Sequence, residues 1–402
     1  MPAFHTMNTM KSAASASASA PRALRAPAAP RARSGARTII AQASPSSHGK
    51  PIAKAATVAS ESAVNMETAS PEALRAKLQE FGRREYVVHD TPIDAMPRLS
   101  QVLDNGVQLF VKRDDLLPLA GGGSKTRKLD YVMQEALDQG ADVIVTSGAV
   151  QSNHCRLTAS AAAREGIECH LVLEERVPGS YDVAAGGNNY TFDLLHAERH
   201  AAGLGEVPKV QDELVAKLEA EGKKVYVIPG GASNPLGSVG YARAALEIVE
   251  YAEENGPFDA IVTCSGSGGT HSGMLAGLRA AGDQTPVYGI SVRFDEKTQK
   301  ERIHAQYVEV AKLFGNDAPI DDVIIRDDQV GPGYSLPTEN MEEALELMAC
   351  HESILLDPVY TAKGFAGLVA MVREGAFPEG SKVLFLHTGG APSLYHYRTL
   401  RH

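Results

Sequence analysis

The sequence predicts an α/β protein built on parallel sheets that helices cover on both faces. Short, continuously apolar segments such as 142–146 and 260–264 alternate with longer segments of helical character. Apolar strands separated by helices are typical of parallel sheets, because both faces of such a sheet are buried. Loops rich in glycine and serine follow these strands, and ligands bind at the carboxyl ends of parallel strands. The pattern therefore predicts that the polar loops meet in one crevice.

The expected elements follow one another in regular alternation, with short apolar strands and longer helices rich in alanine or in charge. We expect helices over 70–81, 129–137, the Ala-rich 154–164, 238–253, 271–280, a charged segment after 292, and 341–351. We expect a proline-punctuated segment over 91–97, an edge hairpin around 107–114, a turn over 147–153, and strands over 142–146, 169–173, 225–228, 260–264, 287–292 and 382–387.

The first sixty residues differ in composition from the rest of the chain. They hold eight basic residues in an Ala-, Ser- and Pro-rich background and no acidic residue, the first of which is Glu61. A leader rich in Arg and Ser, with no acids and no long apolar core, is typical of organelle transit peptides and not of secretory signals. We expect residues 1–60 to direct the protein to the matrix of a mitochondrion or chloroplast; a disordered basic tail is the alternative.

The composition of the remainder excludes several classes of function. The leader's eight positive charges leave a formal charge of −18 on the rest of the chain, against −10 for the whole. A protein with so large a negative charge binds nucleic acid poorly, because the phosphates repel it. No apolar run approaches the roughly 20 residues of a membrane helix, so we expect neither nucleic acid nor a membrane as a partner. The four cysteines form no Cys-x-x-Cys pair, and we expect no disulfide framework and no metal site.

A glycine run at 121–123 brings Lys125 to the first turn of a helix, and Lys128 follows three residues later on the same helical face. Glycine permits unusual backbone angles and lets a flat ligand approach the main chain. Lys125 is therefore a candidate carbonyl-trapping amine or phosphate ligand. The phosphate-loop motif is excluded, because Ser124 stands where that motif has glycine. Two solvated lysines after a Gly-rich turn are the alternative.

Two further loops at strand ends are candidate anion sites. Residues 265–270, Ser-Gly-Ser-Gly-Gly-Thr, join a strand to a helix. Main-chain N–H groups, the positive helix end and the hydroxyls of Ser267 and Thr270 suit a phosphate there. Gln151-Ser-Asn153 also precedes a helix and suits a carboxylate. A ligand-free turn is the alternative for the first loop, and a simple helix N-cap for the second.

Three hydroxyl-bearing residues lie in similar loops. Tyr334 follows Gly-Pro-Gly, Tyr360 follows Asp-Pro-Val, and Thr388 ends a buried strand before two glycines. The tyrosines can donate or orient protons, although most such tyrosines are packing residues. The threonine hydroxyl can bind a heterocyclic nitrogen or its own backbone. An amine, a phosphate cradle and a carboxylate cradle in one crevice suit pyridoxal phosphate acting on an amino acid.

Five motifs also occur in the order found in a known family: Gly-Gly-Ser-Lys125-Thr-Arg-Lys128-Leu-Asp-Tyr131, Val150-Gln-Ser-Asn153, Pro332-Gly-Tyr334-Ser-Leu-Pro, Asp357-Pro-Val-Tyr360-Thr-Ala-Lys-Gly364 and His387-Thr-Gly-Gly-Ala-Pro392. On these motifs the chain resembles the 1-aminocyclopropane-1-carboxylate deaminase/D-cysteine desulfhydrase family of pyridoxal phosphate enzymes, over essentially everything after residue 70. The resemblance implies the tryptophan-synthase-β-like fold of the fold-type-II pyridoxal phosphate enzymes, with the cofactor between two parallel-sheet domains. It places residues 70–132 and 235–402 in a large cofactor-binding domain and 133–234 in a small domain. It also implies a homodimer and a small amino-acid substrate.

The resemblance assigns roles to individual residues by position. Lys125 would form the Schiff base with the cofactor and move the Cα proton of the substrate. The residues that would hold the phosphate are Lys128, Gly266, Ser267, Gly268, Gly269 and Thr270. Asn153 would contact the ring oxygen of the cofactor, and Thr388 would also bind the cofactor. The catalytic set would be Lys125, Ser152, Tyr334 and Tyr360, with Ser152 at the substrate carboxylate or reacting centre and the tyrosines flanking the substrate.

Two positions separate the branches of this family. The deaminase branch has a glutamate after the tyrosine of Asp-Pro-Val-Tyr and a leucine after the histidine of the last strand, where this chain has Thr361 and Thr388. A carboxylate beside the pyridine nitrogen favours its protonation and a strong electron sink, whereas a threonine hydroxyl gives a milder one that is adequate for losing a thiolate. We therefore expect Thr361, Thr388 and Gln151 to set substrate specificity.

The desulfhydrase branch implies a carbon–sulfur lyase that eliminates hydrogen sulfide from D-cysteine and leaves pyruvate and ammonia. Within the enzymes, the alternative is deamination of 1-aminocyclopropane-1-carboxylate to 2-oxobutanoate and ammonia. Outside the enzymes, the alternative is a pyridoxal phosphate carrier or amine sensor. Ser152, Tyr334 and Tyr360 argue against a carrier, because holding the cofactor alone requires none of them.

Overall fold

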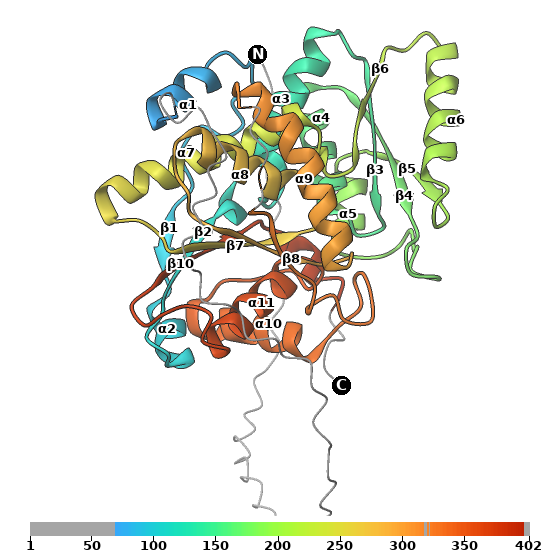
Figure 1. The fold of residues 1–402 in the computed structure, drawn as a ribbon. Helices are drawn as coiled ribbons and strands as arrows, with labels where there is room; N and C mark the ends of the chain where they lie inside the picture. Colours follow the sequence, from blue (N-terminus) through green and yellow to red (C-terminus); the bar gives the residue numbers. More distant parts are fainter. Residues whose placement is uncertain (1–68, 317–319, 321, 398–402) are drawn as a thin grey trace, which may run out of the picture. The chain divides into compact units, whose positions relative to one another are not determined.

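The computed structural model of the chain describes residues 69–316, 320 and 322–397, and the expected leader over 1–60 lies outside the described residues. In the described residues, ten strands form two sheets, with helices on both faces of each (Figure 1). The predicted α/β architecture with parallel sheets is confirmed.

The larger sheet brings together segments from the two ends of the described chain. Its order is β1 (Ile93–Ala95), β2 (Gln108–Arg113), β10 (Lys382–His387), β7 (Ala260–Ser265), β8 (Val287–Ser291) and β9 (Ile324–Arg326). All neighbours are parallel except β1 and β2, which are antiparallel. Leu384 of β10 lies opposite Phe110 of β2 on one side and Ile261 of β7 on the other, so β10 is a central strand.

The smaller sheet is wholly parallel. Its order is β5 (Glu198–Ala202), β4 (Glu168–Glu174), β3 (Val143–Ala149) and β6 (Val225–Ile228). These strands lie within residues 133–234, and those of the larger sheet lie within 70–132 and 235–402. The division of the chain into two domains at these residues stays a prediction.

Each face of the larger sheet has its own apolar core. Ile261 and Leu384 pack with α1 (Pro71–Leu78), α7 (Pro235–Asn255), α8 (Gly269–Ala280) and α9 (Glu296–Leu313). The next residues along the same strands, Val262 and Phe385, pack on the other face with α2 (Pro97–Leu103), α10 (Glu339–Glu352) and α11 (Thr361–Arg373). Figure 1 shows these two helical layers on either side of the sheet. Successive side chains of a strand point to opposite faces, so continuously apolar strands are required here.

The smaller sheet is covered in the same way. Ile144 and Leu171 pack against α3 (Lys125–Asp138), α4 (Asn153–Glu165) and α5 (Asn188–Leu194), while Val143 and Val172 pack against α6 (Val207–Ala220). Three short helical segments complete the described chain: η1 (Asp114–Leu116), η2 (Gly230–Ala232) and α12 (Ala391–Leu394). None of the helices within these described residues is both long and apolar enough to cross a bilayer.

Several predicted bounds and connections are wrong. The expected edge hairpin is two strands joined through α2, which starts at Pro97, and the edge strand is β1. The expected turn over 147–153 is strand as far as Ala149, because residues 147–149 continue the pairing with β4. The helix expected over 129–137 begins at Lys125, as the prediction for Lys125 itself has it. The strands and α-helices that sequence analysis missed are β1, α2, α5, β5, α6, β9, α11 and α12.

Candidate active site

The loops that follow β3, β7 and β10 surround a cavity of about 360 Å³, which we call the lysine cavity. Of the residues predicted from the sequence, those that line it are Lys125, Ser152, Asn153, Gly266, Ser267, Gly268, Thr270, Tyr334, Tyr360 and Thr388. Lys128 and Gly269 lie together just behind this wall, with the lysine amine 2.9 Å from where a Cβ on the glycine would stand. The predicted convergence of the polar loops on one crevice is therefore observed.

Lys125 is the first residue of α3, and the glycines before it adopt backbone angles that favour glycine. Gly122 has φ 75°, and a Cβ there would stand 1.7 Å from the carbonyl oxygen of Asp115. The Lys125 amine donates a hydrogen bond to the Ser124 hydroxyl at 3.1 Å. Burial lowers the pKa of the Lys125 amine, and the charge of the Arg156 guanidinium also lowers it. A larger share of the amine is therefore neutral and nucleophilic near pH 7.

The loop between β7 and α8 has the form of an anion cradle. Gly268 has φ 104°, and α8 begins at the next residue, so the N–H groups of its first turn lack partners within the helix. Ser233 donates to the Ser267 hydroxyl at 2.8 Å, and Lys128 Nζ donates to the Ser233 hydroxyl at 3.2 Å. Burial lowers the pKa of Lys128 well below its usual value. A positive helix end, hydroxyls and a buried amine, with glycine leaving the space open, fit the phosphate of pyridoxal phosphate.

The start of α4 forms another part of the wall. Ser152 is the N-cap of this helix, and its hydroxyl accepts from a backbone N–H at 3.1 Å. Asn153 Oδ1 accepts from Arg156 at 3.0 Å, and Asn153 Nδ2 donates to Asp357 at 3.4 Å. Arg156 also donates to the carbonyl of Gly122 at 2.7 Å. The Ser152 hydroxyl thus caps the helix while it borders the cavity. Asn153 is hydrogen-bonded both to Arg156 of its own helix and to Asp357, which precedes α11.

Tyr334 and Tyr360 share a hydrogen bond between their hydroxyls, and their ring centroids lie 6.0 Å apart in an edge-to-face arrangement. The Tyr360 ring centroid is 5.8 Å from Lys125 Nζ. Burial raises the pKa of both hydroxyls, so each keeps its proton near neutral pH. The two tyrosines can therefore act as a connected pair of proton donors beside the lysine.

Thr388 lies beside Cys264, a residue that sequence analysis missed. Thr388 Oγ1 is 3.2 Å from Cys264 Sγ, and both residues line the lysine cavity. The Thr388 carbonyl accepts from the N–H of Ser124 at 3.0 Å, which joins the last strand to the lysine loop. Burial raises the pKa of the Cys264 thiol, which stays protonated. Its place directly before the 265–270 loop is the signal that could have identified it.

Two residues expected to set specificity do not border the lysine cavity. The Thr361 hydroxyl donates to Asp357 Oδ1 at 3.0 Å and accepts from the Asp357 N–H at 2.7 Å, at the start of α11. Thr361 can therefore reach the cavity only through Asp357 and the adjoining Tyr360. Gln151 borders a second cavity, where its side chain bonds the N–H of Asn188 at 2.9 Å and a backbone carbonyl at 3.0 Å. Both side chains are engaged in local structure that the sequence motifs do not reveal.

Three further residues at the site were not predicted. Burial raises the pKa of Asp357 to about 6, although hydrogen bonds from the N–H groups of Thr361 and Tyr360 act to lower it. Asp357 opens the Asp-Pro-Val-Tyr motif, so a signal for it was present. His154 Nε2 lies 2.8 Å from a threonine hydroxyl, and burial lowers its pKa to about 3, which keeps it neutral. Arg176 lines the cavity from the loop after β4, and no sequence pattern marks it.

Comparison with known proteins identifies the group to which this site belongs. The chain matches the family described as pyridoxal-phosphate dependent enzyme over residues 84–389. A relative named D-cysteine desulfhydrase from Yersinia enterocolitica (serotype O:8 / biotype 1B) is 41% identical over 327 residues, or 81% of this chain and 98% of the relative. A relative of the same name from Klebsiella pneumoniae (strain 342) is 40% identical over 322 residues, or 80% of this chain and 97% of the relative.

Solved structures agree with this match. A structure described as an ACC deaminase homologue is 35% identical, with a TM-score of 0.74 over 81% of this chain and 97% of the other. A serine racemase from Dictyostelium discoideum shares the fold at 16% identity, with a TM-score of 0.54 over 80% of this chain and 98% of the other. The fold is that of the tryptophan-synthase-β-like, fold-type-II enzymes, and pyridoxal phosphate is the cofactor. With its lysine, its phosphate cradle and this match over most of its length, the chain belongs to the family of pyridoxal-phosphate dependent enzymes.

Proposed function

We propose that the protein eliminates hydrogen sulfide from D-cysteine and leaves pyruvate and ammonia. Relatives that are 41% and 40% identical to it carry the name D-cysteine desulfhydrase. The observation that carries the proposal is the place of the Lys125 amine, in one cavity with the 265–270 cradle and the hydrogen-bonded tyrosine pair. Elimination from an amino acid on this cofactor needs a lysine base, a phosphate anchor and a proton donor together.

The chain's own residues divide this work between them. Bound pyridoxal phosphate supplies an electron sink that makes the Cα–H bond of the substrate acidic. Lys128 and the hydroxyls of Ser267 and Thr270 would hold its phosphate at the start of α8, and Asn153 would orient its ring. The neutral Lys125 amine takes the Cα proton, because its lowered pKa leaves it free to accept one.

Other residues that line the lysine cavity bind the substrate and protonate its leaving sulfur. The N–H groups of Asn153 and His154, which lack partners within α4, suit the substrate carboxylate together with the Ser152 hydroxyl. The tyrosine pair stands close to Lys125 and can donate to the leaving sulfur. The products then separate as pyruvate, ammonia and hydrogen sulfide after addition of one water molecule.

Deamination of 1-aminocyclopropane-1-carboxylate is a second candidate, because the solved ACC deaminase homologue is 35% identical to this chain. Opening a cyclopropane that has no α-proton calls for a strong electron sink, which a carboxylate near the ring nitrogen would provide. This chain has Thr361 and Thr388 at the two positions that separate the branches, and only Thr388 of the two borders the lysine cavity. D-Cysteine is therefore the better supported substrate.

Sulfide release from D-cysteine, with L-cysteine in parallel, tests the proposal on the full chain loaded with pyridoxal phosphate. We expect fast release that prefers the D-isomer, and a loss of roughly 10²–10⁴-fold in kcat for Lys125→Ala, which lacks the base. Lys300→Ala, on the exposed surface of α9, is the control and should retain full activity. Elimination that survives in Lys125→Ala would sink the assignment of the base. No sulfide, with 2-oxobutanoate formed from the cyclopropane substrate, would establish the second candidate instead.

We further propose that residues 1–60 are an organelle transit peptide and that the protein forms a homodimer. The acid-free, Arg- and Ser-rich composition of the leader supports targeting. The dimer rests on the family resemblance. A fusion of residues 1–60 to a fluorescent protein that stayed in the cytosol would contradict the first proposal, and a monomer in light scattering would contradict the second.

A further inference from the structure

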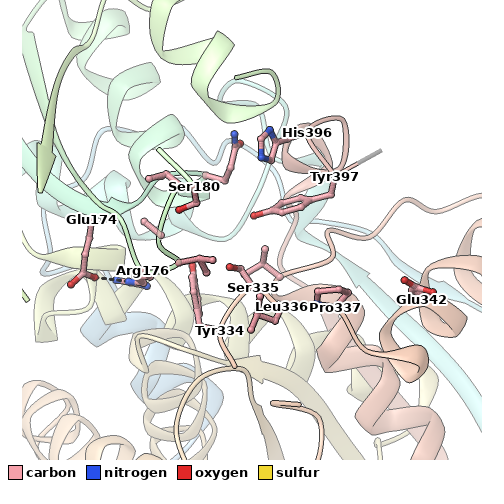
Figure 2. A pocket seen from close by; sticks show the side chains of 15 residues that line it. Glu174, Arg176, Ser180, Tyr334, Ser335, Leu336, Pro337, Glu342, His396 and Tyr397 are labelled. Atoms are coloured by element: carbon pink, nitrogen blue, oxygen red, sulfur yellow. Dashed lines mark hydrogen bonds and ion pairs between the residues drawn. The ribbon is translucent and has the colours of Figure 1, made fainter. Parts of the chain in front are cut away.

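Two cavities meet at Tyr334 and Arg176. The lysine cavity contains Lys125 and Tyr360, and a second cavity of about 300 Å³ adjoins it. Tyr334 and Arg176 border both, and Figure 2 shows them next to each other in the second cavity. The exposed Pro337 also borders the second cavity, which places that cavity at the surface. Tyr334 thus has one side toward the reacting centre and another toward a space that solvent reaches.

The Tyr334 ring lies beside two guanidinium groups. Arg176 Cζ is 4.8 Å from the ring centroid and Arg293 Cζ is 6.0 Å from it. Arg176 is fixed by Glu174, whose carboxylate accepts from its Nε at 2.5 Å. A cation near an aromatic face is attracted to the ring, and it stabilises a negative charge on that ring still more strongly.

The two tyrosines are held at a fixed separation. Their hydroxyls are hydrogen-bonded to each other, and Tyr360 begins the turn that leads into α11. Lys363, one turn further along α11, donates to the carbonyls of Val330 at 2.7 Å and Gly333 at 3.1 Å, just before Tyr334. The loop of one tyrosine is therefore tied to the helix of the other.

The charges around the pair make Tyr334 the hydroxyl that better tolerates loss of its proton. The charged and titratable groups that act on Tyr334 are Arg176, Arg293, Tyr360, Asp357 and Tyr397. Burial raises the pKa of Tyr334, but the Arg176 charge opposes that rise. Burial also raises the pKa of Tyr360, and Tyr334 raises it further, although the Arg176 charge opposes the rise there too. Both guanidinium groups lie over the Tyr334 ring, so a negative charge formed on the pair is best accommodated on Tyr334.

On the basis of the proposed function, we propose that the tyrosine pair carries a proton from the second cavity to the departing sulfur, and that Arg176 and Arg293 are positioning residues that stabilise the charge left on Tyr334. As the Cβ–S bond breaks, the electron pair left on Cα by loss of its proton forms the Cα–Cβ double bond. The pair of the broken bond stays with sulfur, and Tyr360 gives sulfur a proton. Tyr360 takes the Tyr334 proton in turn, which leaves a phenolate beside the two guanidinium groups. Water in the second cavity then returns a proton to Tyr334, and the hydroxide left is neutralised by the Cα proton when Lys125 releases it to solvent. The sulfur departs as neutral hydrogen sulfide.

A comparison of two substrates tests this on the full holoenzyme. β-Chloro-D-alanine loses chloride, which needs no proton, whereas D-cysteine loses sulfur, which in this proposal receives one. For Arg176→Gln we expect kcat for D-cysteine to fall by about tenfold, because a cation–π contact and a general acid are weakened. We expect its KM, and kcat for β-chloro-D-alanine, to change by less than about twofold. Arg176→Lys, which keeps the charge, should recover part of the loss.

Arg164→Gln is the matched control, since Arg164 also lies over a tyrosine ring, that of Tyr86, at 5.3 Å, and takes no part in the site. A second readout is the pH dependence of kcat for D-cysteine. Arg176→Gln removes a charge that lowers the pKa of Tyr334, so the alkaline limb of the profile should move to higher pH. Cofactor absorbance and the melting temperature establish that each variant is folded and loaded.

Equal losses with both substrates would overturn the proposal, because they would mean that Arg176 only shapes the cavity. Unchanged kcat with D-cysteine, or an alkaline limb that does not move, would overturn it as well. The proposed function has its own separate outcome. If the wild-type protein released no sulfide from D-cysteine, that function would fall and the proton path would fall with it.

Discussion

The Cβ that alanine would add at position 268 falls against Gln306, a side chain that holds the phosphate loop. It would stand 2.5 Å from Gln306 Oε1, at a residue with φ 104°, and Gln306 Nε2 donates to the carbonyl of Ser267 at 2.9 Å. We expect Gly268→Ala to raise the Kd for pyridoxal phosphate by about tenfold or more, because the backbone is strained and the cradle must open. Absorbance titration of the cofactor-free protein measures this.

Gly166→Ala provides the control for backbone strain alone. Gly166 has φ 71° at the end of α4, and nothing lies within 4 Å of a Cβ there. Its alanine variant should lose about 1 kcal/mol of unfolding free energy and bind the cofactor normally. Equal Kd values for the two variants would mean that the phosphate is bound elsewhere.

Sequence analysis located the backbone of the site better than its side-chain environment. Glycine-rich loops at strand ends are local features, so the cradle around Gly268 and the lysine at 125 could be predicted. Arg176 and Arg293 reach Tyr334 only because the fold brings three distant segments together, and a single sequence carries no trace of that. Thr361 is the opposite case, because it lies inside a recognised motif and yet does not border the cavity. Its hydroxyl is hydrogen-bonded to Asp357 at the start of α11.

At the scale of elements, helix α3 is held in place by a buried cluster of charges. Arg127 bonds Asp114 at 2.8 Å and Glu247 of α7 at 2.6 Å, and Lys112 of β2 lies 2.8 Å from Glu247. We expect Glu247→Gln to lower the free energy of unfolding by about 3–5 kcal/mol at pH 7, because two buried cations lose their shared anion. Urea unfolding measures the loss.

The pH dependence of that loss has a definite sign. Burial alone would raise the pKa of Glu247, but Arg127 and Lys112 together lower it to about 2, against 4.5 in the unfolded chain. Its contribution is therefore fully present above about pH 4.5 and is lost as the pH falls toward 2. The gap between wild type and Glu247→Gln should narrow below pH 4.5. Glu250→Gln, which breaks an exposed pair with Arg75, is the control and should lower the free energy of unfolding far less than Glu247→Gln does.

The missed elements have different physical causes. Helix α11 is buried on nearly every side, so its apolar run does not distinguish a buried helix from a buried strand. Helix α6 does have a periodic face, with Leu214 and Leu218 buried and Pro208 in its first turn, and could have been predicted. The three-residue strands β1 and β9 are defined by pairing with their neighbours and not by their own sequence.

At the scale of the whole molecule, the lysine cavity is bordered by residues of both sheets and their loops, so bound cofactor should stabilise them together. Ser147 lies near the end of β3 in the smaller sheet, and Ser265 ends β7 of the larger. Pyridoxal phosphate at 100 times its Kd should add about 2.7 kcal/mol. In a chain of this size that raises Tm by roughly 5 °C. Calorimetry should show one transition that moves as a whole.

Pyridoxal without its phosphate is the control for that experiment. It presents the same ring and aldehyde to Lys125 but leaves the cradle at the start of α8 without an anion. A much smaller rise in Tm is expected at the same concentration. An equal rise would show that the cradle contributes nothing to binding.

The central position of β10 governs when the site can exist during synthesis. Among the strands of the described chain, β10 is synthesised last, yet it pairs with β2 and β7. The residue after it, Thr388, accepts a hydrogen bond from the N–H of Ser124, next to the lysine. A nascent chain that has emerged as far as α11 has a divided sheet and an incomplete cavity. Pairing across so long a separation is slow to form, because the loop must close before the contact is gained. A partly synthesised chain is therefore unable to assemble its reactive centre before the last strand enters the sheet.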